Sequence, residues 1–75
     1  MEIIRALGTR GNLRLAQADG RRYPGLLVQG DTLLSLVEEL EDEAPDSFAL
    51  VTVRQWLSAY EEMMAENGIR LPYRR

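Results

Sequence analysis

The side chains that most often perform catalysis are missing from this sequence of 75 residues, which contains neither histidine nor cysteine. It therefore offers no thiolate nucleophile, no zinc–thiolate site and no imidazole to act as a general base near neutral pH. Its serines Ser35, Ser47 and Ser58 have no histidine to activate them, and the sequence has no glycine-rich phosphate loop. These absences predict a protein that is not an enzyme.

Carboxylates are the remaining candidates for metal chemistry, and most of them lie in one stretch. That stretch holds Glu38, Glu39, Glu41, Asp42, Glu43 and Asp46. Such a group could hold a hard cation, but it lacks the glycine-containing loop of a calcium site. A two-metal nuclease needs carboxylates that converge from strands, and only Glu2 and Asp19 lie in or beside the expected strands. We expect a solvated helix face, with no metal and no cofactor.

Charge is unevenly distributed along the chain, and all basic residues are arginine. Residues 1–30 have a balance of +3, residues 31–66 a balance of −9 and residues 67–75 a balance of +3, for a total of −3. The acidic stretch suits a basic protein partner and disfavours nucleic acid. Its simpler interpretation is a charged face that keeps the protein soluble. Three of its residues are our candidates for binding a partner: Glu38, Glu39 and Asp42.

A second candidate surface is the short basic stretch Arg21-Arg22-Tyr23. Guanidinium groups beside an aromatic ring can hold a phosphate or an acidic partner. The same residues are also ordinary in an exposed turn, and that simpler interpretation is favoured.

Length and hydropathy indicate one domain, covering residues 1–75. A chain this short has a small core, and without disulfides or metal it often gains stability by association. No run approaches the roughly 20 apolar residues of a membrane span, and Glu2 stands where a signal peptide would carry positive charge. We expect a cytoplasmic protein.

The first half of the chain predicts a three-stranded antiparallel sheet. Apolar and polar residues alternate in the first two expected strands, 2–7 and 13–18, and a third short strand is expected at 26–29. A five-residue turn at 8–12 and the dipeptide Asp19-Gly20 separate them. Pro24 lacks an N–H group, so it belongs at the start of the third strand or on an edge. We expect one face of this sheet to be covered by helices.

The second half shows helical periodicity. A first helix is expected to open at Leu33, after a sharp turn at Gly30 and a cap from Asp31 or Thr32. Asp46 and Ser47 are good caps for a second helix, which ends at Asn67-Gly68. Residues 47–53 could also form a strand, but their apolar pattern continues to Glu66 and favours a helix. The fold class is therefore α+β, in the order βββαα.

The second helix is apolar around more than one narrow face. Trp56, Tyr60, Met63 and Met64 are interpreted as core residues first and as interface residues second, and Trp56 and Tyr60 remain candidates for partner binding. One small sheet cannot cover all of this surface. We therefore expect a homodimer or larger assembly in which this helix contributes to the contact.

Two motifs resemble the N-terminal module of HicB-type antitoxins. One is Pro24-Gly25 followed by Gln29-Gly30-Asp31-Thr32-Leu33, and the other is Glu66-Asn67-Gly68-Ile69 with Leu71-Pro72. The chain is also similar to small uncharacterised bacterial proteins with an RR[FY]PG…QGD[ST]L block. The resemblance implies a HicB-like fold and a module that binds a small basic ribonuclease toxin.

HicB-type proteins commonly continue into a DNA-binding domain. We expect none here, because the sequence stops at Arg75. A separate departure is the interruption at 43–46, where that family usually has one long helix. The expected function is a non-catalytic partner-binding protein of antitoxin or immunity type. The alternative is a small homo-oligomer with a structural or regulatory role.

Overall fold

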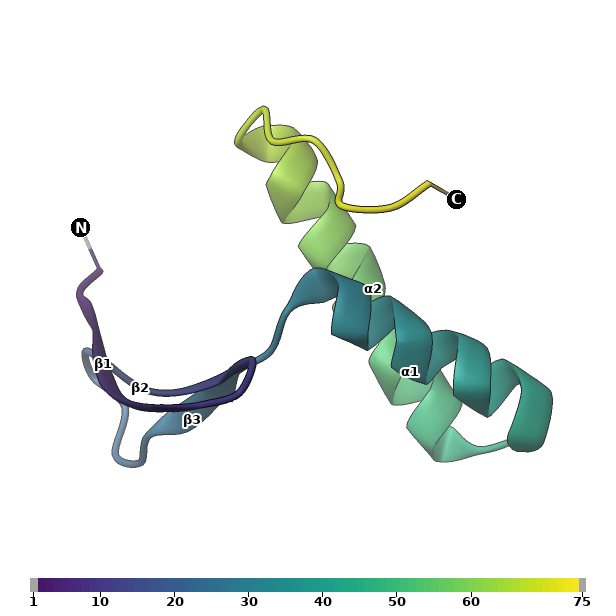
Figure 1. Ribbon diagram of the computed structural model, residues 1–75, viewed down its shortest axis with the longest axis horizontal. Helices are drawn as coiled ribbons and strands as arrows, with labels where there is room; N and C mark the ends of the chain where they lie inside the picture. Colours follow the sequence, from purple (N-terminus) through teal and green to yellow (C-terminus); the bar gives the residue numbers. More distant parts are fainter. Residues whose placement is uncertain (1, 75) are drawn as a thin grey trace.

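The computed structural model describes residues 2–74 and shows a sheet joined to a pair of helices (Figure 1). The predicted βββαα order and the α+β class are confirmed. The elements are β1 (Ile4–Arg10), β2 (Leu13–Ala18), β3 (Gly25–Leu27), α1 (Gly30–Glu43) and α2 (Phe48–Glu66). The sheet is antiparallel with the strand order β1-β2-β3.

The first hairpin is tighter than its sequence indicated. β1 and β2 pair from Ile4↔Ala18 to Arg10↔Leu13, which leaves only Gly11 and Asn12 in the turn. Gly11 has φ +58°, a conformation that glycine adopts without strain. The predicted five-residue turn is therefore wrong. Gly8 and Thr9 belong to β1, and an irregularity between Ala6 and Gly8 shifts its register.

The second turn joins β2 to β3 and follows the predicted chemistry. Gly20 has φ +78°, and the Gln17 side-chain amide donates a hydrogen bond to the Arg21 carbonyl at 2.7 Å. β3 begins directly after Pro24, which confirms the position expected for a residue without an N–H group. The strand covers three residues and ends two residues earlier than predicted.

The start of α1 differs from its prediction. The helix begins at Gly30, its N-cap is Gln29, and no side chain caps it. The Asp31 carboxylate accepts a hydrogen bond from the backbone N–H of Thr32 at 2.9 Å within the first turn. Gly30 is not among the residues with positive φ, so a sharp turn does not explain it. It is buried, and a Cβ built on it would overlap the ring of Tyr60.

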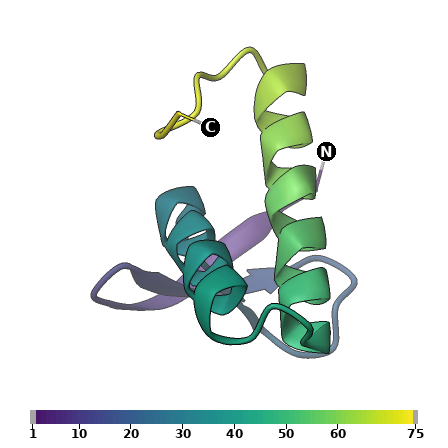
Figure 2. The ribbon, with the colours of Figure 1, turned by 90° about the vertical axis from the view of Figure 1, so that its right-hand side faces the viewer.

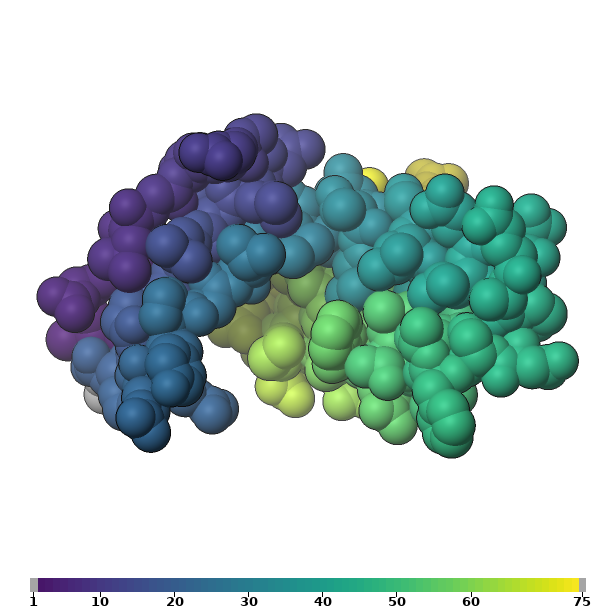
Figure 3. Space-filling view, turned by 90° about the horizontal axis from the view of Figure 1, so that it is seen from below, coloured from purple at the N-terminus to yellow at the C-terminus, as the bar shows by residue number. Residues whose placement is uncertain are grey.

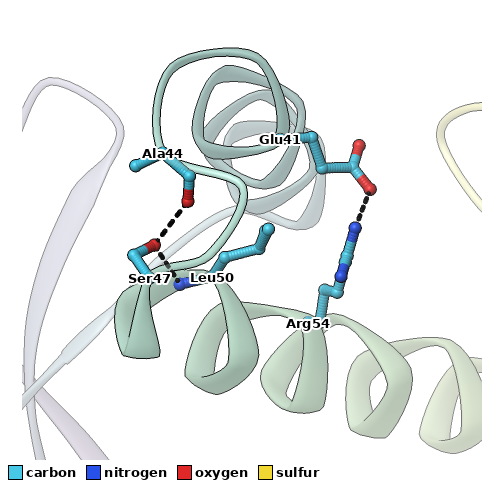
Figure 4. Close-up of polar contacts among 5 residues, drawn as sticks. All are labelled: Glu41, Ala44, Ser47, Leu50 and Arg54. Atoms are coloured by element: carbon cyan, nitrogen blue, oxygen red, sulfur yellow. Dashed lines mark hydrogen bonds and ion pairs between the residues drawn. The ribbon is translucent and has the colours of Figure 1, made fainter.

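The start of α2 resolves the ambiguous residues 47–53 as an N-cap followed by helix. The Ser47 hydroxyl oxygen accepts a hydrogen bond from the Leu50 N–H at 3.2 Å and donates one to the Ala44 carbonyl at 2.7 Å (Figure 4). These two bonds hold the connection from α1 and satisfy one of the free donors of the new helix. The predicted capping role of Ser47 is confirmed.

The end of α2 is also as predicted. Gly68 has φ +66°, its N–H bonds to the Ala65 carbonyl at 3.1 Å, and the Ile69 N–H bonds to the Met64 carbonyl at 2.9 Å. This pair of bonds is a Schellman motif, in which a left-handed glycine ends the helix. The chain then turns back along α2, and the Tyr73 hydroxyl donates a hydrogen bond to Glu61 at 2.9 Å.

The core lies between the two helices. Val37 from α1 packs with Leu50, Val53 and Leu57 from α2, and these are the four buried hydrophobic residues of residues 2–74. Leu33, Leu34, Leu40, Tyr60 and Tyr73 pack around them.

The sheet does not take part in this core, so the expectation that helices cover its face is wrong. Among the five elements, Cα atoms come within 8 Å only between β1 and β2, between β2 and β3, and between α1 and α2. Figure 2 shows the antiparallel helix pair and Figure 3 the indentation between the strand half and the helical half. Only Val28 and Gln29 separate β3 from α1, and the sheet lies beside the helices.

Candidate functional site

An apolar groove lies where the sheet meets the helices. It has a volume of about 350 Å³ and is lined by Leu26, Val28, Thr32, Leu33, Leu36 and Trp56. Five of these six side chains are hydrophobic, and Leu26 and Trp56 are 63% and 59% exposed. Large side chains left in contact with water on facing elements are typical of a protein-binding surface.

Trp56 and Tyr60 were interpreted together as core residues, and the structure separates them. Tyr60 is half-buried, packs against the helix core and lies over Gly30. Trp56 lies on the exposed side of α2, so its interpretation as a core residue is wrong. Apolar residues spaced three to four apart along a helix as long as α2 cover a wide part of its circumference, and only some of them contact α1. Met63 is also exposed, while Met64 is half-buried.

The acidic candidates lie on the outer side of α1. Glu38, Glu39 and Asp42 are all exposed. Glu38 and Asp42 are four residues apart and therefore share a face. Within residues 2–74 no arginine pairs with any of these three, whereas Glu41 pairs with Arg54 of α2 at 2.7 Å (Figure 4). The three free carboxylates form a negative surface that a basic partner could neutralise.

The basic candidates lie at the far end of the sheet. Arg21, Arg22 and Tyr23 are exposed in the turn between β2 and β3. The Arg22 guanidinium carbon lies 5.4 Å from the centre of the Tyr23 ring, which is a cation–π contact. This turn and α1 occupy opposite ends of the molecule in Figure 1. The structure therefore does not join the two candidate surfaces into one site.

Sequence reasoning missed the groove residues Leu26, Val28 and Leu36 as candidates. A signal was present, because Leu26-Leu27-Val28 is an uninterrupted apolar run. Such a run indicates a strand that is covered on both faces. Each of its residues is exposed in this structure.

The arrangement of the carboxylates within residues 2–74 bears on metal binding. No three Asp or Glu side chains of this part of the chain come together in a way that could hold a metal ion. Neither helix of the described residues combines the length and the hydropathy that crossing a bilayer requires.

Comparison with protein-family models gives a match. The model of a family described as "Family of unknown function (DUF6959)" matches residues 1–49, about two thirds of the chain. The match covers the three strands and α1 and ends just inside α2, so it includes the acidic face of α1 and most of the groove. No curated protein and no solved structure matches the chain. The extent of the family match shows that this protein belongs to the DUF6959 family.

Proposed function

We propose that this protein is a non-catalytic, cytoplasmic binding protein of antitoxin or immunity type, and that its partner is a small basic protein. The observation that carries the proposal is the exposed acidic surface of α1, where Glu38, Glu39 and Asp42 have no basic neighbour within the described residues. The resemblance of the Pro24-Gly25 and Gln29–Leu33 motifs to HicB-type antitoxin modules supports the same class of partner.

Electrostatics favours a basic protein over nucleic acid as the ligand. Residues 31–66 have a charge balance of −9, and ten of the twelve acids of the chain lie there. Phosphates would be repelled by this half of the molecule, whereas lysine and arginine side chains would be attracted. The attraction would mainly accelerate association and would weaken as salt is added.

The test is a binding measurement with matched charge variants. Proteins that co-purify with the wild-type chain from its native host would be identified, and a basic candidate would then be purified and titrated in vitro. Glu38→Arg/Asp42→Arg should weaken binding at least tenfold. Asp19→Arg/Glu66→Arg changes the net charge equally at exposed positions away from this face, and should weaken it much less. Equal effects of the two variants would contradict the proposed surface.

The non-catalytic part of the proposal has its own test. The purified protein would be incubated with single- and double-stranded RNA and DNA in the presence of Mg²⁺ or Mn²⁺. We expect no cleavage above that of a mock preparation. Metal-dependent cleavage that Asp19→Asn abolishes would identify a nuclease and overturn this part.

The alternative function is a small homo-oligomer with a structural or regulatory role. The groove between sheet and helices favours it, because self-association is one way to cover Leu26, Leu36 and Trp56. The two functions are compatible, since none of Glu38, Glu39 and Asp42 lines the groove.

A further inference from the structure

Five exposed apolar side chains from the two halves form one continuous surface. Leu13, Leu15 and Leu26 line a hollow on one face of the sheet, and Leu26 also lines the groove with Leu36 and Trp56. Leu15 pairs directly with Leu26 across β2 and β3, and Leu13 lies two residues before Leu15, so the three share that face. The surface thus has a sheet part and a helix part that meet at Leu26.

The two parts carry opposite charge at their margins. Arg5 and Arg10 pair with Gln17 and Leu13, which places both arginines on the same sheet face as Leu15. On α1, Glu39 and Glu43 follow Leu36 by three and seven residues, so they lie along the same side of that helix. Both carboxylates are exposed. The sheet part is therefore bordered by basic groups and the helix part by acidic groups.

We propose that two copies of the chain pair about a two-fold axis, with the sheet part of each copy covering the helix part of the other. A two-fold axis uses the same surface twice, so each basic margin meets the acidic margin of the second copy. Leu13, Leu15 and Leu26 of one copy then cover Leu36 and Trp56 of the other. Of the three residues of the proposed partner-binding surface, only Glu39 also borders this pairing, and Glu38 and Asp42 lie farther around α1 from Leu36.

A second copy explains the surface better than the chain's own fold does. No Cα atom of the three strands comes within 8 Å of one in α1 or α2, and β3 and α1 are joined by only two residues. The chain thus holds its sheet beside its helices without closing one over the other. The four buried hydrophobic side chains of residues 2–74 are a small core, and the pairing would enlarge it.

The first measurement uses the single tryptophan of the chain. Trp56 is exposed in one copy and covered in the pair. Sedimentation or light scattering should give twice the 8.5 kDa chain mass at micromolar concentration. The emission of Trp56 should shift to longer wavelength on dilution, at the concentration where the mass falls. Leu26→Glu should abolish both changes while the far-UV circular dichroism of the helices is retained, since Leu26 lies outside the helix core.

The second measurement uses exchanged charges. Arg5→Glu/Arg10→Glu and Glu39→Arg/Glu43→Arg should each weaken self-association at least tenfold, because like charges then meet in both halves of the pair. An equimolar mixture of the two variants should restore pairing, since each margin again meets its opposite. Glu38→Arg/Asp42→Arg has the same charge change as the second variant but lies farther around α1 from Leu36, so it should weaken the pairing much less.

Three results would overturn the proposal. One is a protein that stays monomeric at all micromolar concentrations. This result contradicts the pairing whether the Trp56 emission is that of an exposed ring or of a ring covered by the sheet of the same copy. Another is a dimer that tolerates Leu26→Glu. The third is a mixture of the two charge variants that associates no better than either variant alone.

Discussion

The ring of Tyr60 in α2 lies against the α-carbon of Gly30, where a side chain on residue 30 would otherwise be. Gly30 is the first residue of α1, so this contact brings the start of one helix against the middle of the other. It gives a packing reason for the glycine of the Gln29-Gly30-Asp31-Thr32 motif.

Gly30→Ala is expected to destabilise the protein. In a helix without tertiary contacts this substitution would raise the unfolding free energy by up to about 1 kcal/mol, because alanine has the higher helix propensity. The sign of the change in unfolding free energy therefore distinguishes helix propensity from packing against Tyr60. Overpacking against Tyr60 should instead cost about 1–3 kcal/mol of unfolding free energy, measured by urea denaturation. Gly25→Ala is the control, because nothing lies within 4 Å of a Cβ there. In a Tyr60→Leu background the cost of Gly30→Ala should shrink. An unchanged cost would show that the ring is not its cause.

Ser47→Ala is expected to lower the unfolding free energy by about 1 kcal/mol. It removes the oxygen that accepts from the Leu50 N–H, and Leu50 is one of the four buried core residues. Ser58→Ala, at an exposed position inside α2, is the matched control and should change the free energy by no more than about 0.5 kcal/mol. Thermal and urea melts would measure both. Equal effects would mean that the cap does not stabilise α2.

Gly68→Ala should destabilise the protein by about 1 kcal/mol, because alanine is strained at a φ of +66°. Gly68→Asn should cost less, since asparagine tolerates the left-handed region. The comparison keeps the position and changes only the conformational preference. If the two substitutions cost the same in a denaturation experiment, backbone strain is not the reason for the glycine.

The ion pair between Glu41 and Arg54 should contribute little. Its side chains are 41% and 53% exposed, so water and salt screen the attraction. A double-mutant cycle with Glu41→Gln and Arg54→Gln should give a coupling of about 0.2–1 kcal/mol that falls in 1 M NaCl. A larger, salt-independent coupling would indicate that the pair also orients the two helices.

Local patterns in the sequence determined the kind and order of the elements. Ser47 and Gly68 act at the helix ends because capping depends on residues within one turn. The apolar spacing from residue 48 to residue 66 was sufficient to identify α2 as one helix, although its first residues could pass for a strand. Gly20 and Pro24 likewise marked the second turn and the start of β3.

The tertiary structure decided which apolar faces meet. Leu57 and Trp56 are neighbours in the same helix, yet one is buried against α1 and the other is exposed at the groove. Periodicity indicates that a face is apolar, but it does not say what covers that face. The first hairpin shows the same limit, since the pairing of Gly8 with Leu15 depends on an irregularity that alternation does not reveal. Gly30 was read as a turn residue because its neighbour Tyr60 is thirty residues away, and only the packing of α2 on α1 brings them together.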